Sequence, residues 1–194
     1  MYCDIDDIKT YLGITEDTDD VLLAQMIAAA QAAIDTYCRR TFEATEDETR
    51  YFDAVADVDG ADLLMASAGD LASITSVTNG DSALLAGTDY VTQPRRQGAE
   101  PIWAIRLLSS SGVTWTYTTD HEGAIAIVGR WAYSTTVKDD IAQACKILAT
   151  WLYRQKDTTS DTDRPLLAGD GTIVMPNRLP SVVNSLLKPY RKYT

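Results

Sequence analysis

Hydrophobic residues follow a helical period near both ends of the chain and a period of two in the middle. The stretch "DIDDIKTYLG" (4–13) predicts a short helix, with Asp4 as its N-cap and Gly13 as its left-handed stop. A second helix is predicted over "VLLAQMIAAAQAAIDTYCRR" (21–40), and its many alanines allow a partner helix to approach closely. The apolar stripe of this second helix is formed by Leu23, Ile27, Ala30, Ile34 and Tyr37.

From about Arg50 the pattern changes to short segments rich in β-branched and aromatic residues, separated by turn residues. Asn79-Gly80 is the pair that favours a tight hairpin, and in "VTWTYT" (113–118) the apolar side chains alternate with threonines. The pattern predicts a six-stranded antiparallel sheet or small barrel over roughly 48–131. The predicted strands are "RYFDA", "LASITSVT", "DYVTQ", "PIWAIRLL", "VTWTYT" and "AIAIVGRW".

Helical periodicity returns at residue 138, where Ile141, Leu148 and Leu152 belong to one apolar stripe. A polar segment follows over 157–178; it predicts a long loop, in which "TIVM" could form a short strand. Pro180 fits the first position of a last helix, which Pro189 closes.

The order of elements predicts an α+β fold, in which a helical bundle contains an inserted antiparallel β-sheet or small barrel. We expect residues 1–47 to form the N-terminal helices of the helical body and residues 48–131 the β module. Residues 132–194 are then expected to complete the helical body with helices, the long loop and a basic tail.

The charge is strongly acidic and unevenly distributed. A net charge of −11 argues against non-specific binding to duplex DNA, which depends on Lys and Arg. Eight acids lie within residues 43–62 against the single base Arg50, whereas the last fourteen residues contain bases and no acid. This tail is either a docking element for an acidic partner or a solvated terminus.

We expect no membrane-spanning helix, since no uninterrupted apolar window approaches the length required to cross a bilayer. Acids also stand at the N-terminus, where a signal peptide would be basic, so we expect a cytosolic site of synthesis. The odd number and wide spacing of Cys3, Cys38 and Cys145 favour buried free thiols over a disulfide scaffold.

Candidate chemistry is sparse. His121, between Asp120 and Glu122, resembles a metal site only weakly, so a solvated turn histidine is favoured. The acids of 43–62 fit a solvated face better than a catalytic pair, and the tryptophans fit core packing better than sugar stacking. Neither "LAGDGT" nor "DTTSDTD" has the spacing of a phosphate or calcium loop. We therefore predict no catalytic residue, metal or cofactor.

Three amphipathic helices in a small helical part leave apolar area that identical neighbours in a closed ring could cover, unless the β module covers it. We expect these apolar flanks to be shared between copies. The candidate ring-packing residues are Leu23, Ile27, Ile34, Ile141, Leu148 and Leu152.

Three stretches resemble the bacteriophage head-tail connector family, also called adaptor or head completion proteins. They are "IDDIKTYLGITEDTDDVLLAQMIAAAQAAIDTYCRRTF" at the start, "GRWAYSTTVKDDIAQACKILATWLYR" at the strand-to-helix junction, and "LPSVVNSLLKPYRKY" at the end. Two features depart from the family pattern. Val137-Lys138 stands where a proline often opens the long helix, and the loop 157–178 has no pattern that aligns with the family.

The resemblance implies a structural ring, usually dodecameric, in the virion neck. Such a ring lies beneath the portal, joins capsid to tail, and lets DNA pass without specific binding. The implied partners are the portal protein, other copies of the chain and a tail-side neck, stopper or tail protein, with no membrane and with assembly in the host cytoplasm. The tail is then a peg that becomes ordered on docking to the portal. Its candidate docking residues are Lys188, Tyr190, Arg191, Lys192 and Tyr193.

A second hypothesis is a carboxylate-dependent hydrolase or a carbohydrate-binding module. It predicts that changes to the acids of 43–62 or to the tryptophans abolish an activity without affecting assembly.

Overall fold

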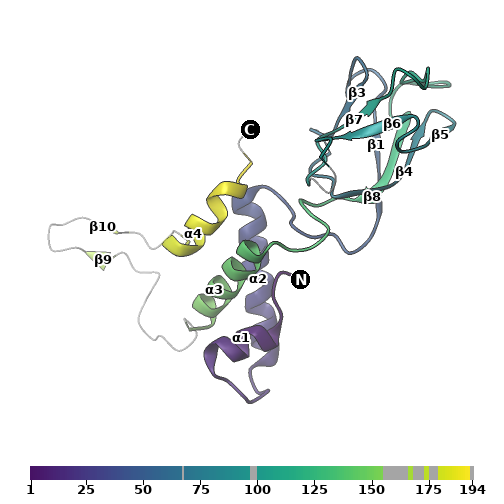
Figure 1. Cartoon of the computed structure of the whole chain (residues 1–194). Helices are drawn as coiled ribbons and strands as arrows, with labels where there is room; N and C mark the ends of the chain where they lie inside the picture. Colours follow the sequence, from purple (N-terminus) through teal and green to yellow (C-terminus); the bar gives the residue numbers. More distant parts are fainter. Residues whose placement is uncertain (67, 97–99, 155–165, 168–172, 175–178, 193–194) are drawn as a thin grey trace. The chain divides into compact units, whose positions relative to one another are not determined.

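The chain forms two units, one of which interrupts the other in the sequence. The computed structural model describes all residues except 67, 97–99, 155–165, 168–172, 175–178 and 193–194. Met1–Arg39 and Lys138–Thr194 form a helical unit, and Arg40–Val137 forms a β unit (Figure 1). The α+β class, with antiparallel strands between two helical segments, is confirmed.

The β unit extends beyond the expected 48–131 at both ends. The rings of Phe42 and Tyr133 lie 5.6 Å apart, and the backbone N–H of Tyr133 donates to the carbonyl of Thr41 at 2.7 Å. Ser134 is buried beside Phe42. These contacts make the segments on either side of the sheet part of the β unit rather than free connectors.

The helical unit contains α1 (Ile5–Leu12), α2 (Asp20–Cys38), α3 (Asp139–Arg154), α4 (Ser181–Leu187) and the 3₁₀ turn η2 (Lys188–Tyr190). Both predicted ends of α1 are confirmed. The side chain of Asp4 accepts the backbone N–H of Asp7 at 2.8 Å, and Gly13 has the left-handed φ of 70°. Helix α3 packs against α1, α2 and α4, so it is the centre of this unit.

Helix α2 is long and apolar enough to cross a membrane by length and composition, contrary to the expectation from the sequence. The many alanines contribute to its mean hydropathy of 1.3. Its two charged residues, Asp20 and Asp35, lie in the first and last turns and do not interrupt the apolar stretch between them. The core helix of a globular protein can pass the same test, and the buried stripe of α2 packs within the helical unit. Its buried residues are Leu23, Ile27, Ala30, Ile34 and Cys38.

The β unit has two antiparallel four-stranded sheets rather than one six-stranded sheet, and within the described residues neither closes into a barrel. The first sheet has the order β1-β8-β4-β5 and the second β2-β3-β7-β6. The strands of the first are β1 (Glu48–Phe52), β8 (Ile125–Arg130), β4 (Ser73–Asn79) and β5 (Ser82–Leu84). Those of the second are β2 (Val58–Asp59), β3 (Asp62–Leu64), β7 (Ala104–Leu107) and β6 (Tyr90–Gln93).

Side chains from both sheets meet in a single core. Strand β8 alternates buried and half-buried residues along its length, as its period-two pattern predicts. Large members of this core, with 1% exposure or less, are Phe52, Leu63, Met65, Leu71, Val77, Ile105, Ile125 and Ile127.

The hairpin at Asn79-Gly80 is confirmed, with Gly80 and Asp81 as its two loop residues between Asn79 and Ser82. The strand predicted over 113–118 is wrong, because this segment pairs with no strand. Instead the side chain of Asn79 donates to the carbonyl of Thr114 at 2.9 Å and accepts the backbone N–H of Thr116 at 2.9 Å.

In the long loop, β9 (Leu166–Leu167) and β10 (Ile173–Val174) pair antiparallel, so the short strand expected in "TIVM" is present. The stretch "DTTSDTD" and most of "LAGDGT" lie outside the described residues.

Candidate functional site

The C-terminal segment, which the sequence marks as a docking element, is folded against α2 up to Lys192. The backbone N–H of Lys192 donates to the carbonyl of Cys38 at 3.0 Å, which satisfies a carbonyl in the last turn of α2. The guanidinium of Arg191 lies 5.4 Å from the centre of the Tyr37 ring. These contacts give the segment a fixed place within the helical unit.

Two further members of the predicted docking set differ in their availability. The hydroxyl of Tyr190 donates to Asp140 at 3.0 Å, whereas Lys188 has an exposed side chain. Tyr193 lies outside the described residues. Up to Lys192 the segment is folded within the helical unit, and its docking to the portal stays a prediction.

The candidate ring-packing residues are mostly core residues of the single chain. Leu23, Ile27, Ile34, Ile141 and Leu148 are at most 2% exposed, and Leu152 is half-buried. Because α1, α3 and α4 already cover these stripes, the first five have no surface left for a second copy. These five side chains pack within one subunit, and contact between copies through the helical flanks stays a prediction.

Other apolar side chains of the helical unit do reach solvent. Val21 at the start of α2 is 75% exposed, Val182 on α4 is 57% exposed, and Trp151 on α3 is 40% exposed. These exposed apolar residues are available for contact with another molecule.

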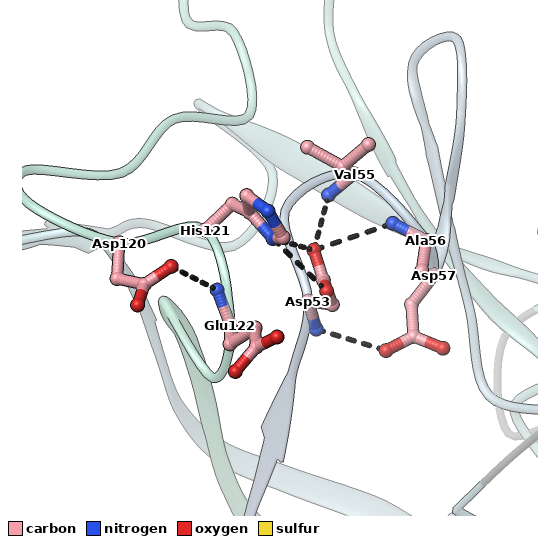
Figure 2. A network of polar contacts seen from close by, with 7 residues as sticks. All are labelled: Asp53, Val55, Ala56, Asp57, Asp120, His121 and Glu122. Carbon is pink, nitrogen blue, oxygen red and sulfur yellow. Dashed lines mark hydrogen bonds and ion pairs between the residues drawn. The ribbon is translucent and has the colours of Figure 1, made fainter.

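His121 belongs to a polar network between two turns of the β unit rather than to a freely solvated turn (Figure 2). Its Nδ1 lies 3.1 Å from both carboxylate oxygens of Asp53, and its backbone carbonyl accepts the N–H of Ala54 at 3.0 Å. Asp53 also accepts the backbone N–H groups of Val55 and Ala56 at 2.8 and 3.3 Å.

The hydrogen bond from the Val55 N–H lowers the pKa of Asp53, and the bonds from Ala56 and His121 act in the same direction. The carboxylate of Asp57 accepts the backbone N–H of Asp53 at 2.9 Å, which closes the turn on its other side (Figure 2). This network, the Asp53 clasp, joins the turn 53–57 to the turn that contains His121.

The acids of 43–62 are dispersed among structural partners. Arg106 donates through Nε to Asp62 at 2.6 Å, and this hydrogen bond lowers the pKa of Asp62. Asp47 lies 3.7 Å from Arg130, while Glu48 accepts from Arg50 at 2.9 Å. Among the described residues, no group of three or more His, Cys, Asp or Glu could hold a metal ion.

The tryptophans divide into two classes. Trp131 is buried, and its indole N–H donates to the carbonyl of Glu48 at 2.9 Å. Trp115 packs against the core of the β unit and lines a cleft of 370 Å³. The prediction of core packing is confirmed for these two and is wrong for Trp103 and Trp151, which are 52% and 40% exposed.

A buried lysine is the polar feature that the sequence pattern did not reveal. Lys9 is only 8% exposed, and its ammonium lies 2.5 Å from Asp17 and 2.9 Å from Asp20. The hydrogen bonds with Asp17 and then Asp20 raise the pKa of Lys9, and the bond from Lys9 lowers the pKa of Asp17. The cluster fixes α1 to the first turn of α2. The only sequence signal for this cluster is the spacing of Asp17 and Asp20, eight and eleven residues after Lys9.

A family model described as "Head completion protein" matches residues 2–193. No curated protein matches the sequence significantly. Among solved structures, a chain of "Neck of empty GTA particle computed with C6 symmetry" is similar with a TM-score of 0.56 and 15% identity, over 97% of this chain and 89% of that chain. A chain of "Virion of native gene transfer agent (GTA) particle" is similar with a TM-score of 0.52 and 18% identity, over 91% of this chain and 80% of that chain. At these identities the two structures establish a shared fold.

Proposed function

Since the chain belongs to the head completion protein family, we propose that it is a structural head-tail adaptor in the neck of a tailed phage or phage-like particle. The observation that carries this proposal is the family match over residues 2–193, which spans both units. The fold shared with a chain of a gene transfer agent neck supports it. In this role the chain acts as a connector and not as a catalyst.

The proposed assembly is a closed ring of identical copies. A dodecameric ring contains the six-fold symmetry used for the neck particle whose chain has this fold, so that symmetry is compatible with the expected stoichiometry. The contacts between copies involve the exposed apolar residues Val21, Trp151 and Val182. Truncation of a buried stripe residue would instead act through the fold of each subunit.

The ring joins the portal protein on the capsid side to a neck, stopper or tail protein on the other side. The C-terminal segment, in which Lys188 and Arg191 are exposed, is the proposed portal contact. A net charge of −11 suits a wall that DNA passes without binding, because few cations are available to hold phosphate. The particle is assembled in the host cytoplasm, and the adaptor stays in the virion neck.

The test is the mass of the purified chain alone and after mixing with portal rings, measured by native mass spectrometry and checked by electron microscopy of the complexes. The proposal expects a closed ring, either alone or on the portal. A monomer that stays monomeric and does not bind portal contradicts it. Val21→Asp is a matched probe of ring contacts, and exposed Thr36→Asp on the same helix is its control.

A further inference from the structure

Cys3 and Cys145 are 142 positions apart in the sequence, yet their sulfur atoms lie 3.0 Å apart. Cys3 precedes α1 and Cys145 lies near the middle of α3, and both thiols are free and buried. A disulfide requires a sulfur-sulfur distance of about 2.05 Å, so the two atoms need to approach by only about 1 Å.

A neighbouring contact holds Cys3 in its position opposite Cys145. Tyr2 is only 5% exposed, and its hydroxyl donates to Asp35 of α2 at 2.6 Å. The N-terminal segment is therefore fixed to α2 through Tyr2 while Cys3 faces α3. Cys38, the third cysteine, lies apart from this pair, with its sulfur 3.9 Å from the carbonyl of Leu187.

The two thiols differ in their readiness to ionise. The hydrogen bond with Cys145 lowers the pKa of Cys3, and the neighbouring Lys146 acts in the same direction. The same hydrogen bond and burial raise the pKa of Cys145. Cys3 is thus the thiol that reacts first, because its thiolate forms more readily than that of Cys145.

We propose that Cys3 and Cys145 are a modification site, at which a small-molecule disulfide such as oxidised glutathione converts the thiol pair into an intramolecular disulfide. The Cys3 thiolate attacks one sulfur of oxidised glutathione, which forms a mixed disulfide on Cys3 and releases one glutathione thiolate. Cys145 then attacks the Cys3 sulfur and displaces the second glutathione, which takes up the proton that Cys145 loses. Two protein thiols are oxidised, and one glutathione disulfide is reduced to two glutathione thiols.

The new bond joins the N-terminal segment covalently to α3 and closes a loop that contains α1, α2 and the entire β unit. A loop of this length restricts the unfolded chain strongly, so the oxidised protein is more stable than the reduced one. The inference depends only on the thiol geometry and is independent of the proposed function. The chain would then have a reduced form in a reducing compartment and an oxidised form in an oxidising one.

The test starts with the reduced full-length chain, incubated without denaturant in oxidised glutathione at neutral pH. The remaining thiols are then alkylated in denaturant, and the intact mass and the proteolytic peptides are measured. The expected product has lost two hydrogen atoms, carries one alkyl group on Cys38, and yields a linked pair of peptides containing Cys3 and Cys145. The oxidised protein is expected to unfold about 5–15 °C higher than the reduced one.

Variants separate this reaction from general thiol oxidation. Cys38→Ala is the matched control, and it should form the internal bond as the natural chain does. Cys145→Ala should stop at a glutathione adduct on Cys3, and Cys3→Ala should lose the stability gain. Three alkylated thiols in the natural chain, a bond between two chains, or a linked peptide containing Cys38 would overturn the proposal. Because peptide mapping uses the natural chain, its result stands even where a variant fails to fold.

Discussion

The side chain of Asn79 takes the place of a neighbouring strand for Thr116, whose backbone N–H donates to Asn79 Oδ1 at 2.9 Å. The amide group of Asn79 also donates to the carbonyl of Thr114, and the side chain is only 2% exposed. A single buried amide thus satisfies two backbone groups of a segment that has no ladder of its own.

Asn79→Ala is expected to lower the free energy of unfolding by about 1–3 kcal/mol, because it removes both hydrogen bonds that hold the segment 113–118 to β4. Urea denaturation measures the change. Ser82→Ala, at the exposed position paired with Asn79 in the hairpin, is the control and should change stability by less than about 0.5 kcal/mol. Equal stability of the two variants would show that the amide does not anchor the segment.

Gly129 on β8 is a position where a side chain has no room. A Cβ added there would lie 2.2 Å from the carbonyl oxygen of Ser73 on the adjacent strand β4. Gly129→Ala should therefore destabilise the β unit by about 3 kcal/mol or more, since the two strands must separate.

Gly60→Ala is the matched control for Gly129. Gly60 has a φ of 62° with nothing within 4 Å of an added Cβ, so only backbone strain of about 1 kcal/mol is expected. Thermal unfolding of the two variants distinguishes a clash from strain, and a smaller loss at Gly129 than at Gly60 contradicts the expected geometry.

The Asp53 clasp predicts a dependence of stability on pH. Because the pKa of Asp53 is lower in the folded chain than its ordinary 3.8, its contribution is complete above that value and is lost as the pH falls through the folded pKa. Asp53→Asn, which keeps an acceptor oxygen but does not titrate, should flatten this part of the stability curve. Thermal unfolding from pH 7 into the acid range measures the effect, and parallel curves for the two proteins would contradict it.

Buried and exposed positions of α2 should respond differently to substitution. Ile34→Ala removes a fully buried side chain and should cost about 2–5 kcal/mol of stability in the isolated chain. Val21→Ala, at 75% exposure, should leave unfolding nearly unchanged and lower the fraction of chain in rings. Denaturation and native mass spectrometry separate the two effects. Unaltered ring formation by Val21→Ala would show that Val21 does not lie at a contact between copies.

The C-terminal segment offers a test of portal docking. Lys188→Glu reverses an exposed charge, so it should weaken binding to portal rings about tenfold at low salt and leave the chain folded. Tyr190→Phe keeps the ring and removes the hydroxyl that donates to Asp140, so it serves as the control for local stability. If Lys188→Glu binds portal rings with unchanged affinity at all salt concentrations, the docking site does not include Lys188.

The helices could be predicted closely from the sequence because their signals are local. Asp4 caps α1, Gly13 ends it, and the stripes of α2 and α3 are the buried faces. The strand predicted at 113–118 is wrong because alternation of apolar and polar residues indicates which side chains are buried. It does not indicate whether the backbone forms hydrogen bonds with another strand. The short strands β2, β3 and β5 were missed because two or three residues carry too little periodicity.

The candidate site was harder to predict, because its contacts join distant parts of the chain. The basic tail stood out by charge, but the bond from Lys192 to Cys38 has no sequence signature. The proximity of Cys3 and Cys145 likewise depends on how α3 returns to the N-terminal segment. Burial of Leu23 and Ile141 within one chain follows from helix packing that periodicity alone cannot assign to one chain or to two.

The interruption of the helical unit by the β unit has a consequence for synthesis on the ribosome. Arg40–Val137 is continuous and can fold as soon as it emerges, whereas the stripe of α2 is covered only in part, by α1, until α3 and α4 have been made. A nascent chain released before residue 138 therefore carries a finished β unit and an exposed apolar helix, which is a form that chaperones bind and proteases remove.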